Sequence, residues 1–344
     1  MRKIIIHLLI VFFMSSGVCW AAGAYLELGA VKKYTKTIIV APVGSTSENG
    51  TLLLNSLNGI AGNSNENPFL LKLEPGIYDI GSSPLEMKEF VHIEGAGEGA
   101  SIIVGNVNAT DSGVIIAAND TELRFVSIQN LGDDVGSLTH SIGIYCNETS
   151  PRITHVTVWA KNGDRHCYAV NVLGGAAPLL TNVSLNAIDA GDTNIGLYVQ
   201  SADSAPTIRN SEIFVSGGSE NRGVYVETYA SAYLDDVEIT AVGTSAHGVF
   251  FKTVGDVEVL NCRIDAAYAV LVSGTAGTGG TLKIDSSIII GTSNGVRNDN
   301  GANTTFYVGA SRIEGANSTS NITCVGTYDG SYAPLNGTCQ PPPP

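Results

Sequence analysis

The sequence predicts an all-β protein, a right-handed parallel β-helix (solenoid) that begins with a capping α-helix. From residue 141 onward the chain repeats itself with a period in the middle twenties. Each unit starts with a small residue and a short apolar piece, and these pieces are rich in Val and Ile without helical spacing. Such units cannot bury an apolar side alone, so they are expected to stack as coils around a common core.

Residues 1–21 have the three-part layout of a secretory signal peptide. Two basic residues precede an apolar run from Ile4 to Met14, and small residues end the segment. This run is too short to span a bilayer, and no later stretch is apolar enough for a membrane helix. We therefore expect a secreted or cell-surface protein with no membrane span. The alternative is a buried N-terminal helix.

The charge balance is strongly acidic. Loss of the signal peptide removes two of the 18 basic residues and none of the 32 acidic ones, so the formal charge moves from −14 to −16. Phosphate binding needs clusters of basic residues, and the sequence has none, so no nucleic-acid partner is expected. Calcium, or a neutral or cation-bridged glycan, fits this charge better.

Residues 22–64 form an N-terminal segment that contains the capping helix. Ser47 and Asn49 are candidate caps for its start. An open β-helix end exposes core and unpaired strand edges, so a cap is needed there. Four apolar residues share one face of the expected helix: Leu53, Leu54, Leu57 and Ile60.

Residues 65–316 are expected to form the β-helix itself, with equivalent side chains in columns. Every second residue of a strand points to the same side, so two columns should face the core. The first column is Ile144, Val170, Leu197, Val224, Val249, Val270 and Val296. The second is Cys146, Val172, Val199, Val226, Phe251 and Val272.

A third column marks a turn between two sheets. Asn and Asp tolerate left-handed backbone angles, and their side chains can bond between coils, so we interpret this column as structural. Its members are His155, Asn182, Asn210, Asp236 and Asn261.

Residues 317–344 are expected to form a C-terminal cap followed by a disordered proline tail. The odd number of cysteines in the processed chain implies at least one free thiol or an intermolecular bond. Cys324 and Cys339 flank a short loop and are candidates for a disulfide, and two unpaired thiols are the alternative. The five cysteines are Cys146, Cys167, Cys262, Cys324 and Cys339.

An outward row on one strand of each coil is rich in aromatic residues. Parallel strands lie ~4.8 Å apart, so the row forms a ladder that could stack against sugar rings. It could equally stack on itself and stabilise the sheet. The candidate substrate-binding residues are Tyr145, Tyr198, Tyr225 and Phe250, and the row also holds Asn171 and Leu271.

The loops that enter this strand carry acidic and polar residues, which stacking should bring together. The cluster could provide an acid and a base or hold Ca²⁺, which prefers several oxygen ligands. Solvated loops are the alternative, because turns favour Asp and Gly in any case. His92, His140 and His247 have no such cluster and are interpreted as surface or packing residues. The candidate catalytic residues are Asp164, Arg165, His166 and Asp192, and the candidate metal ligands are Asp133, Asp134, Asp189 and Glu220.

The N-terminal part of the chain, over about residues 50–130, resembles pectin methylesterases of the pectin-lyase-like superfamily. The resemblance lies in an amphipathic helix, then the strand and turn from Leu73 to Tyr78, then the Gly-rich run from Ile93 to Ile103. It implies the parallel β-helix fold. It does not imply one reaction, because superfamily members include lyases, hydrolases, esterases and non-catalytic surface proteins.

The catalytic motifs of pectin methylesterases are absent. Where their oxyanion-stabilising glutamine is expected, the chain reads Ser141 to Ile144 without Gln, and the aspartate motifs are missing too. The first hypothesis is therefore a secreted or cell-surface β-helix that binds polysaccharide or is structural, with no demonstrable catalytic motif. The second is a polysaccharide-active enzyme, a pectate-type lyase or methylesterase-like carbohydrate esterase acting on acidic glycans. The sequence leaves open whether the protein is an enzyme.

Overall fold

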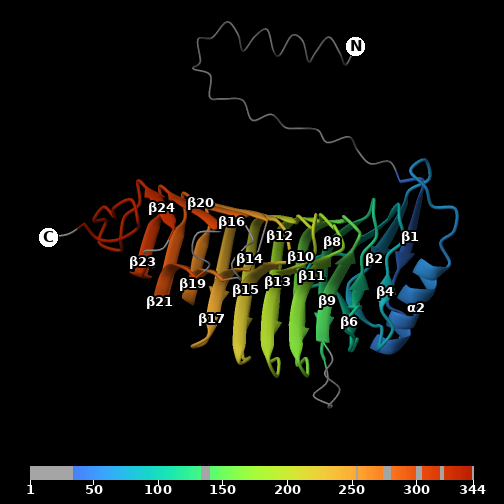
Figure 1. Ribbon diagram of the computed structural model, residues 1–344. Helices are drawn as coiled ribbons and strands as arrows, with labels where there is room; N and C mark the ends of the chain where they lie inside the picture. The colour runs from blue at the N-terminus through green and yellow to red at the C-terminus, as the bar shows by residue number, and fades with distance from the viewer. Residues whose placement is uncertain are drawn as a thin grey trace, which may run out of the picture. The chain divides into compact units, whose positions relative to one another are not determined.

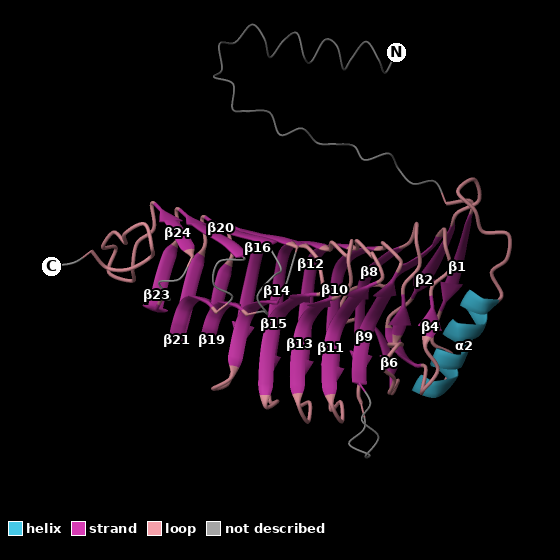
Figure 2. Ribbon diagram, in the orientation of Figure 1, coloured by secondary structure: helices cyan, strands magenta, loops and turns pink. Residues whose placement is uncertain are grey.

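Parallel strands stacked coil upon coil make up most of the described chain (Figures 1 and 2). The computed structural model describes residues 34–132, 140–252, 255–273, 280–299, 304–317 and 321–342. The predicted signal peptide, residues 1–21, lies outside them, as do Asp133 and Asp134. Within the described residues no helix is long and apolar enough to cross a membrane. The predicted parallel β-helix is confirmed, and it has about nine turns.

The strands form three parallel sheets, and the first sheet contains the strand that begins each coil. Its strands pair in parallel with the equivalent strand of the next coil. It consists of β1 (Lys36–Val40), β2 (Phe69–Leu73), β5 (Val91–Glu94), the first parts of β8 (Glu122–Asn130), β10 (Arg152–Lys161), β12 (Leu179–Ile188), β14 (Thr207–Ser216) and β16 (Ala232–Ala241), and then β18 (Asp256–Leu260), β20 (Gly280–Asp285), β22 (Thr304–Gly309) and β24 (Ile322–Val325).

The second and third sheets complete each coil. The second sheet consists of β3 (Gly76–Asp79), β6 (Ser101–Gly105), the second parts of β8, β10, β12, β14 and β16, the first parts of β19 (Arg263–Val272) and β21 (Ile288–Asn298), and β23 (Arg312–Ala316). The third consists of β4 (Leu85–Glu86), β7 (Ile115–Ile116), β9 (His140–Asn147), β11 (His166–Leu173), β13 (Thr193–Val199), β15 (Glu220–Glu227), β17 (Ala246–Lys252) and the second parts of β19 and β21.

The predicted turn column separates the first sheet from the second. All five of its predicted residues have positive φ, from 49° at Asn210 to 56° at Asp236. Phe125 holds the same position in β8, with φ 54°, and was not predicted because an aromatic residue is rare there. Both predicted inward columns are fully buried, from Ile144 to Val296 and from Cys146 to Val272. One core therefore runs through the stack.

Helix α2 (Thr46–Asn58) covers the N-terminal end of the stack and packs mainly on β3 (Figure 1). Its Leu53 and Leu57 side chains are buried in the core. The predicted caps are wrong: the N-cap is Ser45, which forms a reciprocal capping box with Glu48. The backbone of Ser45 is extended, whereas Asn49 lies inside the helix and accepts hydrogen bonds from two loop amides.

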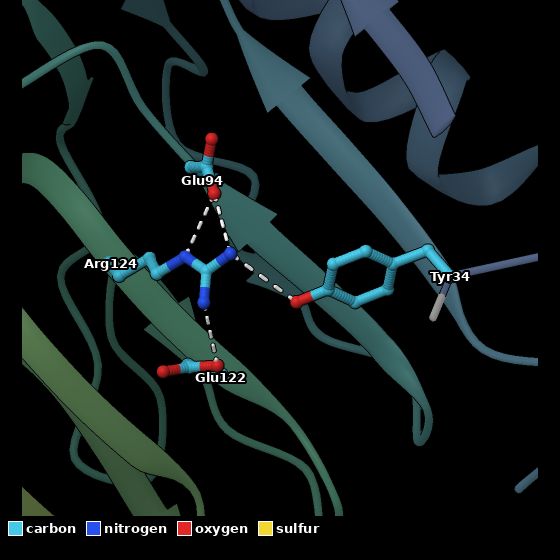
Figure 3. A network of polar contacts seen from close by, with 4 residues as sticks. All are labelled: Tyr34, Glu94, Glu122 and Arg124. Atoms are coloured by element: carbon cyan, nitrogen blue, oxygen red, sulfur yellow. Dashed lines mark hydrogen bonds and ion pairs between the residues drawn. The ribbon is translucent and has the colours of Figure 1, made fainter. Parts of the chain in front are cut away.

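An ion-pair network on the outside of the first sheet holds the start of the described chain (Figure 3). Arg124 donates to Oε2 of Glu94 from Nε and Nη2, at 2.9 and 2.6 Å, and to Glu122 at 3.0 Å. Its Nη2 also lies 3.4 Å from the hydroxyl of Tyr34, whose ring is 5.3 Å from that of His92. The network joins residue 34 to successive coils of the sheet.

The C-terminal end is closed by a disulfide between Cys324 and Cys339, so the predicted pairing is confirmed over two unpaired thiols. Strand β24 continues the first sheet past residue 316, and the Asn317 side chain donates to the Cys339 carbonyl at 2.8 Å. Cys146, Cys167 and Cys262 are free and buried. Burial raises the pKa of the Cys146 thiol to about 12, so this thiol is unreactive.

Candidate functional site

The candidate site lies on the outward side of the third sheet, on strands β9, β11, β13, β15, β17 and β19, which lie side by side (Figure 1). We call it the third-sheet face. The parallel register places Tyr198, Tyr225 and Phe250 in adjacent strands, as the repeat predicted. Tyr145 is separated from Tyr198 by Asn171. These side chains form an apolar cluster separate from the core.

The aromatic rings of the third-sheet face stack on one another. The ring centroids of Tyr198 and Tyr225 are 5.2 Å apart, and those of Tyr225 and Phe250 are 5.1 Å apart. Tyr168 extends the row, 5.1 Å from Tyr198. Tyr168 was not predicted as part of the row, although it lies on β11 three residues before Asn171. Tyr168 thus extends the row from Tyr198 toward the two histidines described below.

Stacking leaves little of the row exposed. Tyr145 and Tyr225 are each 7% exposed and Phe250 is 9% exposed, while Tyr198 is half-buried. The hydroxyls of Tyr198 and Tyr225 both donate to the carboxylate of Glu227. The row thus strengthens the sheet in the way that cross-strand aromatic pairs do. Of the four predicted rings, Tyr198 offers the most surface to a ligand.

Two histidines of the third-sheet face, His140 and His166, are the first residues of strands β9 and β11. The rings of His140 and His166 are 4.8 Å apart, and both contact Tyr168, at 5.3 and 5.7 Å. The prediction that His140 has no such cluster is therefore wrong. Burial, then the neighbouring His140 and Arg165, lower the pKa of His166 to about 4, and burial lowers that of His140 as well. Both imidazoles are therefore neutral near pH 7 and able to accept a proton.

The remaining predicted catalytic residues lie in the loops before β11 and β13. Arg165 and Asp192 form an exposed ion pair at 3.6 Å, and the Asp192 amide donates to the Arg165 carbonyl at 2.9 Å. Asp164 is half-buried in the same loop as Arg165. The stack therefore brings Arg165, His166 and Asp192 to one edge of the face. Guanidinium and imidazole groups there can bind a carboxylate and accept a proton.

The predicted metal ligands do not form a calcium site among the described residues. Glu220 pairs with Arg222, and Asp189 lies in a turn with φ 59°. Asp133 and Asp134 lie outside the described residues. In the part of the chain that the structure describes, no three His, Cys, Asp or Glu side chains gather so that they could hold a metal ion. The calcium prediction therefore stays untested at Asp133 and Asp134, and no chemistry is assigned to Ca²⁺ here.

Arg222 occupies the middle of the third-sheet face. Its guanidinium lies 4.4 Å from the ring centroid of Tyr225 and 4.5 Å from that of Phe250, a cation–π arrangement on both rings. Several buried side-chain atoms of the same face make no hydrogen bond, and a buried polar atom without a partner destabilises the fold unless a ligand satisfies it. On this face these atoms are His140 Nδ1, His166 Nδ1, Asn171 Oδ1, Arg222 Nε and His247 Nδ1.

The buried histidines make the stability of this face depend on pH. Burial, then Arg222 and Arg297, lower the pKa of His247 to about 4, against about 6.5 in an unfolded chain. Between these values the unfolded chain binds the proton and the folded chain does not, so stability falls as pH falls from about 6.5 to about 4. Urea unfolding should be measured at pH 7.5 and pH 5. The free energy of unfolding should fall less between these pH values for His247→Gln than for the wild type. Equal losses would contradict the lowered pKa.

No family model matches the chain, and no curated protein does. Among solved structures, it is similar to pectate lyase Pel9A, with 12% identity over 91% of this chain and 88% of that one, at a TM-score of 0.55. It is also similar to ORF18 of Geobacillus virus E2, with 12% identity over 85% of this chain and a TM-score of 0.52. The chain spans 60% of the length of the viral protein. Identities this low show the fold alone. The likeness therefore shows that the chain shares the fold of these two structures, the parallel β-helix described above.

Proposed function

We propose that this protein is an exported β-helix protein that binds polysaccharide along the third-sheet face. The observation that carries the proposal is the coincidence, on one face, of the aromatic row with buried polar atoms that lack partners. Asn171 is 5% exposed and His247 is 8% exposed, so each is held out of water without a hydrogen bond from the atom concerned. Sugar hydroxyls both donate and accept, and a bound glycan could satisfy such atoms after small side-chain movements.

Polysaccharide fits the layout of this face better than a compact small molecule does. The aromatic row and the groups beside it repeat from coil to coil, so they present similar contacts along the stack. Export is supported by the signal-peptide pattern and by the disulfide at Cys324 and Cys339. Pectate lyase Pel9A, which has the same fold, is named for activity on an acidic polysaccharide.

Binding should depend on Tyr198, the most exposed of the four predicted rings. Tyr198→Ala is expected to weaken the affinity for polygalacturonate or alginate oligosaccharides about tenfold, since a lost ring contact of about 1.4 kcal/mol corresponds to that factor. Isothermal titration calorimetry of the processed protein would measure it. Calcium should be tested in a parallel titration, because it could bridge an acidic glycan to carboxylates.

Tyr307→Ala provides the matched control. Tyr307 is also a strand tyrosine, 45% exposed, but it lies on the outward side of the first sheet in β22. Its removal should leave the affinity unchanged. If the wild type binds neither polygalacturonate nor alginate oligosaccharides, or if both tyrosine variants bind them as well as the wild type does, the third-sheet face is not the binding site.

A second candidate function is catalysis on an acidic polysaccharide. It is favoured by the neutral pair His140 and His166 beside Tyr168, with Arg165 next to them. In a β-elimination, an imidazole would remove the proton beside a uronate carboxylate that Arg165 neutralises. The electron pair forms the C4–C5 double bond as the C4–O bond breaks, and the leaving oxygen takes up a proton.

An assay of substrate turnover distinguishes polysaccharide binding from catalysis. Pectins, alginate and other uronans should be incubated with the processed protein, with and without Ca²⁺, while unsaturated product, methanol and reducing ends are followed. Unsaturated product that disappears in His166→Ala, Asp164→Ala or Asp192→Ala would establish the lyase. Binding without turnover would leave the binding function alone.

A further inference from the structure

A second surface with features of a carbohydrate site lies on the outward side of the second sheet, over β10, β12 and β14. We call it the second-sheet face. Its strands pair in register and carry two parallel outward rows, two residues apart along each strand. One row is Thr157, Ser184, Glu212 and Glu238, and the other is Trp159, Asn186, Phe214 and Thr240. Neither row belongs to the third-sheet face.

Two aromatic side chains stand in the second row with one strand between them. Phe214 is 38% exposed and Trp159 is half-buried, whereas Asn186 between them is 6% exposed. Strands are ~4.8 Å apart, so the two rings stand about 10 Å apart along the stack. Their separation allows each to contact a different sugar ring, in contrast to the third-sheet row, whose rings cover one another. The Lys161 ammonium lies over the Trp159 ring, 4.6 Å from its centroid, as a cation–π contact.

A hollow of about 230 Å³ lies at the first of these rows, where Ser184 and Glu212 form part of its lining. Hydroxyl, amide and carboxylate groups line it, and these hydrogen-bond well to sugars. Glu98 accepts a hydrogen bond from Thr157 at 2.5 Å, which fixes the carboxylate at the edge of the hollow. His155, whose ring stacks on that of Phe125 with centroids 5.0 Å apart, also belongs to the lining. The lining includes Glu98, His155, Ser184, Asn210 and Glu212.

The charge of the hollow selects among glycans. Glu98 and Glu212 both line it, and in the described part of the chain neither forms an ion pair with a basic side chain. Two carboxylates without cationic partners repel a polyuronate, and they accept strong hydrogen bonds from neutral hydroxyls. The hollow therefore favours an uncharged sugar over an acidic one.

We infer that the second-sheet face binds a neutral, extended polysaccharide that runs along the stack across Trp159 and Phe214. In an extended chain of pyranose rings, alternate rings present the same side at a spacing close to two strand spacings, so each could lie on one aromatic ring. The hydroxyls of the intervening sugar then face the hollow, where Glu212 and Ser184 accept their hydrogen bonds. This site is independent of the proposed third-sheet site, because it lies on another sheet and takes an uncharged ligand.

The test titrates the processed protein with cellohexaose and xylohexaose, which are extended and neutral, and with hexagalacturonate, which is extended and acidic. The expected result is binding of at least one neutral hexasaccharide with a Kd of about 1 mM or tighter. Trp159→Ala and Phe214→Ala should each weaken this binding about tenfold or more, and Trp159→Phe should retain most of it. Glu212→Gln should weaken binding of the neutral hexasaccharide and should allow hexagalacturonate to bind at this site.

Controls keep this result separate from the third-sheet face and from misfolding. Tyr198→Ala and Tyr307→Ala should bind the neutral ligand like the wild type, and the thermal unfolding of every variant should be recorded. The inference is overturned if neither neutral hexasaccharide binds, or if binding survives in the double variant of Trp159 and Phe214. Loss of hexagalacturonate binding in Tyr198→Ala, with neutral binding intact, would support both sites. Neutral binding alone would leave this inference standing without the third-sheet proposal.

Discussion

Gly223→Val should lower the free energy of unfolding by about 3 kcal/mol, since overpacking of a close-packed core has costs of this size. A β-carbon at Gly223 would lie 2.2 Å from Cγ2 of Ile239 in the next coil and 2.6 Å from the carbonyl oxygen of Gly248. The first contact is with a core side chain and the second with the backbone of a paired strand. Neither can move without shifting a neighbouring coil. Urea denaturation followed by circular dichroism would measure the loss.

Position 223 belongs to a column of small residues, each of which directly precedes a residue of the first inward column. Gly196 and Gly248 have the same close approach, with an isoleucine Cγ2 at 2.2 and 2.1 Å. Ala169 and Ala269 hold the column position in other coils, so Gly223→Ala should cost less than Gly223→Val. Gly99→Val is the matched control, because a β-carbon at Gly99 meets nothing within 4 Å. A loss below about 1 kcal/mol for Gly223→Val would show that the coils can separate there.

Asn221→Ala should destabilise the protein by about 3 kcal/mol, because it leaves several buried polar groups without partners. The Asn221 amide donates to the carbonyls of Gly218 and Val242, at 3.2 and 2.9 Å. Its Oδ1 accepts from the Asn194 side chain at 2.9 Å, and Asn194 in turn donates to the Ser216 carbonyl. Both asparagines are almost fully buried. The two side chains thus tie together the loops that enter the third sheet.

A double-mutant cycle tests whether the asparagines act as a unit. Asn194→Ala combined with Asn221→Ala should cost less than the sum of the single losses, because the second substitution removes a group that the first had already left unpaired. Asn63→Ala is the control, since Asn63 makes a single exposed hydrogen bond, to the Glu89 carbonyl. Additive losses in the cycle would mean that each asparagine serves only its own loop.

The repeat made much of the fold predictable. Inward positions such as Val170 and Val224 follow from the two-residue period of a strand, and the turn column from residues that tolerate positive φ. Both signals are local and recur in every coil, so they can be recognised without knowing the contacts. The cap at Ser45 was missed because several polar residues near the helix start could cap it, and only the backbone conformation distinguishes them.

The candidate sites were less predictable, because they depend on contacts between coils. The row of Tyr145, Tyr198 and Tyr225 was visible as a column, but its burial was not, since burial depends on how each ring packs against its neighbours. Tyr168 joins the row across an offset between adjacent strands, which no single-strand pattern encodes. The proximity of His140 to His166 likewise comes from the pairing of β9 with β11.

The sequence by itself determined the architecture: stacked coils, a core of matched columns, a helix at one end and the cysteine pair at the other. Only the tertiary structure decided which surfaces can meet a ligand. Trp159 and Phe214 are far apart in sequence, and they become neighbours across one strand because coils stack in register. The physical reason is that strand period and turn preference act within a few residues, whereas exposure and charge pairing depend on every coil that packs alongside.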